Sequence, residues 1–169
     1  MNSHNSKLEM DHIKVLTRSG LLIALSAIGA MIKIQGTIAF DSMPGYFAAL
    51  FINPVAGGFV AALGHLLTAV TSGFPLTFPM HLMLTLVMGA IAYLFGVLKK
   101  KTNGIVACAV AIILNGPIAT HISAITAKLL GLPFSGSAMI AALVVPLTVA
   151  SAVNIILAYI IFKAIEKNR

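Results

Sequence analysis

Long apolar stretches separated by short polar segments dominate the pattern along this chain. A helix needs about 20 apolar residues to cross the hydrocarbon core of a bilayer, which is about 30 Å thick. The pattern therefore predicts six membrane-spanning helices, at about Val15–Ile34, Met43–Ile52, Val55–Val70, Pro79–Leu98, Ile105–Ala127 and Ala138–Phe162. The second stretch is short and ends at Asn53-Pro54, so we expect a tilted helix or one packed against its neighbours.

The composition agrees with a membrane protein. Hydrophobic residues make up 59% of the chain and charged residues 9%, whereas a soluble domain has about 45–50% and about 25%. So few charges cannot cover the surface of a soluble globule of this size. This excludes a soluble enzyme, a nucleic-acid-binding protein and a disordered chain. The predicted fold class is an all-α integral membrane bundle.

The basic residues predict how the bundle is oriented, because Lys and Arg concentrate on the cytoplasmic side of membrane proteins. With six spans and a cytoplasmic N-terminus, the cytoplasmic set is Lys7, Lys14, Arg18, Lys99, Lys100, Lys101, Lys163, Lys167 and Arg169, and the outer set is Lys33 and Lys128. Five spans would place the Lys99–Lys101 loop and the C-terminal tail on opposite sides. We therefore expect a cytoplasmic tail at residues 1–14, a six-helix domain at 15–162 and a basic cytoplasmic tail at 163–169.

This topology puts three loops on the outer side, at about Gln35–Ser42, Thr71–Phe78 and Lys128–Ser137. These loops are rich in Gly, Pro, Ser and Thr. Loops of this kind often carry function, so we expect the outer face to bind something.

Polar groups within a membrane are costly and point to functional sites. Asp41 is the only acidic residue between Asp11 and Glu166. It could bind a cationic or hydroxyl-bearing ligand or latch the first loop, and either Asp41 or Ser42 could also cap the second helix, since these roles can coexist. His65, in the middle of the third span, either contacts a ligand or forms a hydrogen bond between helices. The topology places His81, Asn115 and His121 toward the outer side. It places Asn154 in the inner half of the last span, too deep for a ligand.

No metal or cofactor is expected. His81 and His121 have no carboxylate or thiolate cluster beside them in the sequence, and Cys108 is the single cysteine. Neutral imidazoles suit hydrogen bonds to an organic ligand equally well. A carrier of Ni²⁺ or Co²⁺ remains one alternative, and tight binding of either ion would reveal it.

The sequence also argues against catalysis. It contains no nucleophile elbow, no His-Glu-x-x-His motif and no Walker motif, and it has no run of intramembrane carboxylates. We therefore expect a protein that is not an enzyme and that relies on another subunit for energy. Two further alternatives are a solo secondary transporter and a small membrane enzyme that uses His65, His81 and His121.

Small residues form a stripe along the first helix, at Gly20, Ala24 and Ala27. Such stripes let helices pack closely in lipid. The helix that packs against this stripe belongs either to the same chain or to a partner.

The spans, the basic cytoplasmic side and four local motifs together resemble the substrate-binding S components of energy-coupling factor (ECF) vitamin transporters. These motifs are Arg18–Leu25 (RSGLLIAL), Pro44–Leu50 (PGYFAAL), Asn53–Gly58 (NPVAGG) and Gly64–Thr68 (GHLLT). The resemblance covers about Val15 to Phe162. It implies import driven by two ATPase subunits and a transmembrane coupling subunit, in a prokaryotic cytoplasmic membrane.

The same resemblance implies roles for individual residues. In the family, an Ala-x3-Ala stripe on the first helix docks onto the coupling subunit. Gly20 and Ala24 match it here, with Gly in place of the first Ala, and Ala27 extends it. The family's pocket opens outward, with the first loop as a lid. By topology this implies a substrate-binding set of Asp41, Phe74, Phe78, His81, Asn115, His121 and Thr126.

The ligand that the resemblance suggests first is α-ribazole, a nucleoside precursor of cobalamin. The residues that carry this are Gly36–Ser42 (GTIAFDS) and Thr71–Thr77 (TSGFPLT). Phe74 or Phe78 offers an aromatic face for a benzimidazole ring. Pantothenate, riboflavin, cobalamin or another B vitamin remain alternatives.

Overall fold

A computed structural model describes residues 3–35 and 38–168. Helix α1 (Ser3–Gly29) leads into an antiparallel hairpin of β1 (Lys33–Gln35) and β2 (Ile38–Ala39). The helix begins earlier and ends earlier than the predicted first span. It ends at Gly29, where the chain packs so closely on the next loop that a Cβ would lie 2.2 Å from the carbonyl oxygen of Phe40. Five residues of the predicted tails and first outer loop lie outside the described residues: Met1, Asn2, Gly36, Thr37 and Arg169.

The predicted second span is the short helix α2 (Met43–Phe51). Its 9 residues rise about 13 Å at about 1.5 Å per residue, less than half of a bilayer core. Among the described residues, five helices are long and apolar enough to cross a membrane, and α2 is not one of them. The helix still reverses the direction of the chain. Asn53 then begins α3 (Pro54–Thr71), because its side chain accepts a hydrogen bond from the backbone N–H of Ala56 at 2.8 Å.

The remaining chain forms three long rods. The first is α4 (Phe78–Lys101), which ends in the predicted tri-lysine turn. The second is one continuous rod built from α5 (Gly104–Ile113), the π-helical turn η1 (Leu114–Ile118) and α6 (Ala119–Leu129). Pro117 lies inside η1 and has no N–H to donate to the preceding turn, which is a usual cause of a helix irregularity. The third rod is α7 (Gly136–Lys167).

Glycine and alanine bring α2 and α3 into close contact. A Cβ on Gly45 would lie 2.6 Å from the Cβ of Ala61, and a Cβ on Gly57 would lie 2.3 Å from that of Ala49. Close approach of backbones at small residues is typical of helices that pack in lipid. Helix α2 also packs against α1, α4 and α7.

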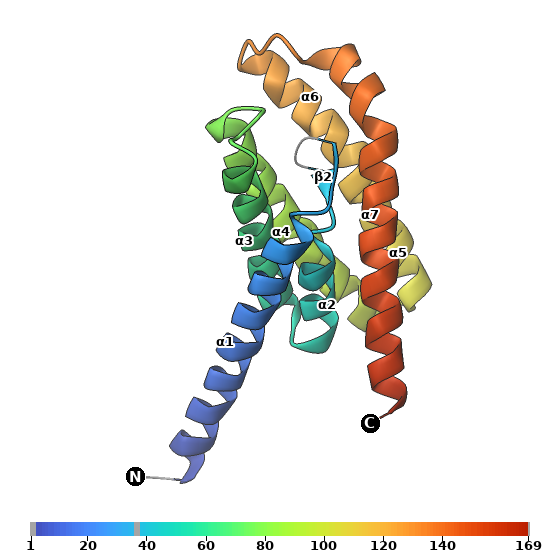
Figure 1. The fold of residues 1–169 in the computed structure, drawn as a ribbon. Helices are drawn as coiled ribbons and strands as arrows, with labels where there is room; N and C mark the ends of the chain where they lie inside the picture. Colours follow the sequence, from blue (N-terminus) through green and yellow to red (C-terminus); the bar gives the residue numbers. More distant parts are fainter. Residues whose placement is uncertain (1–2, 36–37, 169) are drawn as a thin grey trace.

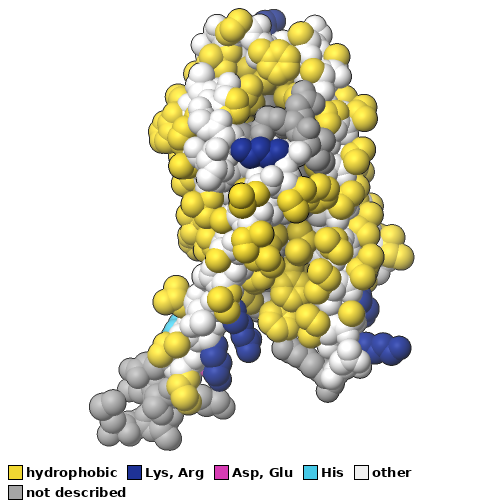
Figure 2. Space-filling view, viewed as in Figure 1, with side chains coloured by type: hydrophobic (Ala, Val, Ile, Leu, Met, Phe, Trp, Pro, Cys, Tyr) yellow, Lys and Arg dark blue, Asp and Glu magenta, His cyan; other side chains and the backbone are white. Residues whose placement is uncertain are grey.

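The surface of the molecule is apolar. Figure 2 shows hydrophobic side chains over the middle of one face, with Lys and Arg mostly toward the end that carries both termini. Helix α1 tilts away from the other helices along its N-terminal part (Figure 1), and little of its Met10–Gly29 segment is buried. These features are those of a multi-pass membrane protein. That the terminal end is cytoplasmic remains a prediction.

Candidate functional site

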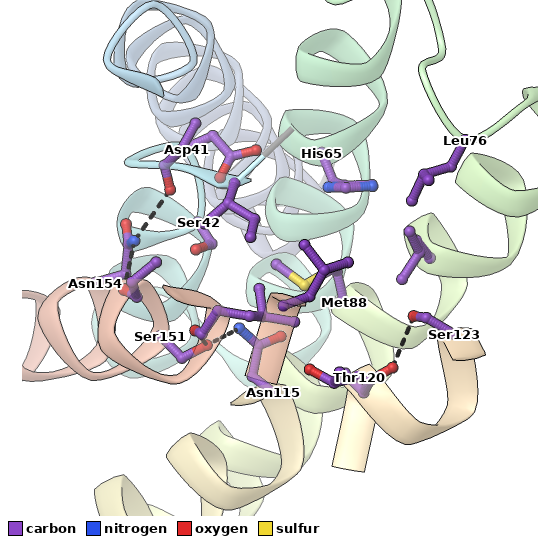
Figure 3. Close-up of a pocket in the computed structure, with 17 residues that line it drawn as sticks. Asp41, Ser42, His65, Leu76, Met88, Asn115, Thr120, Ser123, Ser151 and Asn154 are labelled. Carbon is purple, nitrogen blue, oxygen red and sulfur yellow. Dashed lines mark hydrogen bonds between the residues drawn. The ribbon is translucent and has the colours of Figure 1, made fainter. Parts of the chain in front are cut away.

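A cavity of about 70 Å³ lies between the first loop and helices α3, α4, α6 and α7 (Figure 3). Its apolar wall includes Leu84, Met88 and Leu143. Its polar lining groups come from every surrounding element except α4: Asp41, Ser42, His65, Asn115, Thr120, Ser123, Ser151 and Asn154. Pockets for organic ligands usually measure about 300–1,000 Å³. A vitamin-sized molecule therefore needs more space than the cavity has in this conformation.

Asp41 belongs to the first loop and is 3% exposed. Its Oδ2 accepts a hydrogen bond from the Thr68 hydroxyl of α3 at 2.5 Å. The N-cap position of α2 is Ser42, which makes no side-chain capping bond. The capping alternative for Asp41 is therefore wrong. Its carboxyl instead ties the first loop to α3 at the edge of the cavity.

Burial raises the pKa of Asp41 from 3.8 to about 6, against the hydrogen bond from Thr68, which lowers it. Because the folded-state pKa is higher than the unfolded one, protonation of Asp41 stabilises the fold. This stabilisation is complete below about pH 4 and is lost as the pH rises through about 6.

The pKa of Asp41 makes a testable difference to stability. As the pH falls from 7.5 to 4, we expect the free energy of unfolding of wild type to rise by up to roughly 3 kcal/mol relative to that of Asp41→Asn. The variant lacks this change because Asn stays neutral throughout. Thermal unfolding of both proteins in detergent across this range measures the effect. A stability difference that does not change with pH would contradict it.

Asn154 holds the first loop in place. Its Oδ1 accepts from the backbone N–H of Met43 at 2.9 Å, and its Nδ2 donates to the carbonyl oxygens of Ala39 at 3.3 Å and Ala150 at 2.9 Å. The prediction that Asn154 lies too deep for the site was wrong. The first loop descends to the middle of the bundle, as the position of β2 in Figure 1 shows, and the cavity follows it.

Asn115 projects into the cavity from η1 and is 2% exposed. Its Nδ2 donates to the Ser151 hydroxyl at 2.7 Å, and that hydroxyl donates to the carbonyl of Leu147 at 2.6 Å (Figure 3). Nδ2 is the end of the amide that pairs with Ser151. Its Oδ1 has no hydrogen-bond partner among the described residues. π-Helical turns often occur at functional sites, and here the turn presents an unpaired acceptor.

His65 and His81 connect α3 to α4. His65 Nε2 lies 3.5 Å from His81 Nδ1, and the backbone N–H of Leu76 donates to His81 Nε2 at 3.5 Å. If both rings are neutral, His81 carries its proton on Nδ1 and His65 on its own Nδ1. His65 therefore combines both predicted roles, because it bonds between helices and also lines the cavity. His81 does not line the cavity, and it bonds to the His65 ring, which does.

The other predicted binding residues do not line the cavity. The Phe74 ring packs against Phe78 and His81, with centroid distances of 5.4 and 5.8 Å. Phe78 is 55% exposed. His121 is exposed and donates from Nδ1 to the carbonyl of Pro117 at 2.8 Å. Thr126 is half-buried, one turn beyond the cavity-lining part of α6.

Sequence reasoning missed Thr120 and Ser123, which neighbour the predicted His121 on α6. Successive helical residues are about 100° apart, so these two face the cavity when His121 faces outward. Their spacing of three was a usable signal. The alignment of Thr120 with Asn115 could not be predicted, because two residues five positions apart share a helix face only where a π-helical turn such as η1 lies between them.

Among the described residues, no three His, Cys, Asp or Glu side chains are grouped to hold a metal.

Comparison with known proteins identifies the family. The model of the family described as "ECF transporter, substrate-specific component" matches residues 14–166. No curated protein and no solved structure matches the chain. The family match spans almost all of the bundle, including every element that lines the cavity. The chain therefore belongs to the substrate-specific component family of ECF transporters.

Proposed function

We propose that this chain captures a vitamin or vitamin precursor from outside a prokaryotic cell and carries it into the cavity for import. The observation that supports this best is a cavity with an apolar wall and convergent polar groups, which is typical of sites for small organic ligands. Members of the family are transporter subunits that associate with transmembrane and ATPase components. Those components supply the energy, since this sequence has no Walker motif.

Among the predicted binding residues, the proposal centres on Asp41 and Asn115, which line the cavity. His81 contributes through His65, and Phe74 packs on His81 in turn. Phe78, His121 and Thr126 have no contact with the cavity and receive no direct role in it.

For the ligand we propose α-ribazole first. The ring system of a nucleoside suits the wall of Leu84, Met88 and Leu143, and its ribose hydroxyls suit Asp41 and Asn115. The loop that Asn154 and Thr68 hold over the cavity must open to admit a molecule of this size.

We further propose that the small residues of α1 dock onto the coupling subunit. Gly20 and Ala24 are exposed, and a Cβ built on Gly20 meets no atom within 4 Å. By contrast, Ser26 and Ala30 are buried against the bundle. The stripe of Gly20 and Ala24 therefore faces away from the chain's own helices, where a partner helix can approach it.

Binding by the isolated protein tests the proposal. We expect one compound of a B-vitamin and precursor panel, with α-ribazole included, to bind the detergent-purified chain with sub-micromolar Kd in calorimetry. The same compound should raise the Tm, because a ligand that binds only the folded state stabilises it. Absence of binding by every compound would refute the proposed function.

A further inference from the structure

Three hydroxyl groups of the cavity donate their protons to backbone carbonyls one helical turn earlier. Thr120 donates to Gly116 at 2.8 Å and Ser123 donates to Ala119 at 2.7 Å, both from α6. Ser151 of α7 donates to Leu147 at 2.6 Å. A hydroxyl has one proton and two lone pairs. Thr120 and Ser123 therefore each keep two acceptor lone pairs, and Ser151 keeps one, because its other lone pair accepts from Asn115 Nδ2.

The unpaired Oδ1 of Asn115 adds an acceptor that needs a donor. A buried acceptor without a partner costs free energy that a hydrogen bond would recover. Nδ2 donates to the Ser151 hydroxyl, whose own proton goes to the carbonyl of Leu147, so Oδ1 is the end of the amide without a partner. The atom that completes this site must therefore carry an N–H or O–H.

The charges of the residues that line the cavity also favour a ligand that donates hydrogen bonds and carries no negative charge. Among the described residues, no Lys or Arg lines the cavity, and Asp41 is its one carboxylic acid. Lys33 and Lys128, the basic residues predicted for the outer side, are exposed. An anion in this cavity would be buried without a countercharge and beside a carboxyl group, which is strongly unfavourable.

We propose that the cavity selects an uncharged or cationic ligand that places an N–H or O–H donor on Asn115 Oδ1. This rests on the proposed function and narrows its substrate class. Asp41 is a second acceptor, and Ser42 and His65 are groups that can also donate. Ligands that carry a carboxylate or phosphate are rejected, which removes pantothenate from the alternatives and retains nucleosides such as α-ribazole.

Matched pairs of compounds test the selection by charge. The pairs are α-ribazole and its 5′-phosphate, riboflavin and its 5′-phosphate, pantothenol and pantothenate, and nicotinamide and nicotinate. Calorimetry on the detergent-purified chain at pH 7.5 gives the Kd of each compound. In every pair that shows binding, we expect the uncharged member to bind at least about a hundredfold more tightly.

The outcomes separate the two proposals. Tighter binding of a carboxylate or phosphate member overturns the selectivity and leaves the proposed function standing. Absence of binding by all eight compounds and by the wider vitamin panel overturns the proposed function, and the selectivity with it.

A second measurement tests Asn115 itself. Asn115→Leu keeps a side chain of similar size but removes the acceptor, so we expect the affinity for the bound compound to fall about tenfold or more. The Tm of the ligand-free protein should change little, because the variant removes the unpaired buried Oδ1 but also loses the hydrogen bond from Nδ2 to Ser151. Ile113→Leu, at an exposed position on the same rod that does not line the cavity, is the matched control and should change neither quantity.

A purely structural role predicts the reverse pattern for Asn115→Leu. In that case the Tm of the ligand-free protein falls and the affinity of the folded protein is unchanged. That result would overturn the assignment of Asn115 as the residue that accepts the ligand's donor.

Discussion

Ala24→Trp is expected to abolish energy-coupled uptake while the isolated chain still binds its ligand with wild-type affinity. Ala24 is exposed on α1, four residues from Gly20 on the same face. Close helix packing in a membrane requires small residues at the contact, and an indole there holds the two helices apart. The cavity is lined by other elements, so its ligand contacts remain.

Two assays on the same variant measure this effect. Uptake of labelled ligand by cells that contain the complete transporter should fall by at least about tenfold, and calorimetry on the purified chain should give an unchanged Kd. Ala109→Trp is the matched control, because Ala109 is an exposed alanine on α5 and should tolerate the change. Normal uptake by Ala24→Trp would refute the docking face, and loss of binding would show that α1 supports the cavity.

Asn154→Leu is expected to lower the stability of the fold and to speed up release of the ligand. The change removes the acceptor for the Met43 N–H and the donor to Ala39, which are the two bonds from α7 to the first loop and the start of α2. A buried hydrogen-bonding group left unpaired costs about 1–3 kcal/mol. We therefore expect a loss of roughly 2–4 kcal/mol in stability and ligand release that is at least about tenfold faster.

Thermal unfolding and the dissociation rate of the ligand, both in detergent, measure these two effects. Asn154→Gln retains both an acceptor and a donor at this position and should recover part of the stability. Asn103→Leu removes only the cap of α5, where the side chain accepts from the Val106 N–H at 2.9 Å, and it should leave ligand release unchanged. If Asn154→Leu releases ligand at the wild-type rate, Asn154 does not hold the loop over the site.

Most of the helical framework follows from local sequence. The predicted spans from Val55 onward match α3, α4, the α5–α6 rod and α7 within a few residues at each end. This works because a chain in lipid must satisfy its backbone hydrogen bonds within each span, so an apolar stretch of sufficient length becomes a helix. Asn53 and Asn103 reinforce two starts by accepting hydrogen bonds from the backbone.

The first loop shows where local sequence stops being sufficient. Apolar residues 31–34 continue the pattern of the first span, yet the helix ends at Gly29 and the chain forms a hairpin. The bonds that hold this loop join it to α3 and α7: Thr68 to Asp41 over 27 positions, and Asn154 to Met43 over 111. Contacts over such separations leave no periodic signal in the sequence.

The sequence by itself determined the class of protein, the helices from Pro54 onward and three of the residues that line the cavity, Asp41, His65 and Asn115. In lipid, each span must satisfy its own backbone hydrogen bonds, so each helix can be predicted nearly independently of the others. Polar residues are costly in a span, so each one indicates a candidate functional or structural role. Only the tertiary structure decided which polar groups meet. The depth of the first loop brought Asn154 to the cavity, and the π-helical turn at Leu114–Ile118 aligned Asn115 with Thr120. The tertiary structure also decided that Asn115 Oδ1 is unpaired, because the hydrogen-bond partners of a buried atom depend on which neighbours reach it once the helices have packed.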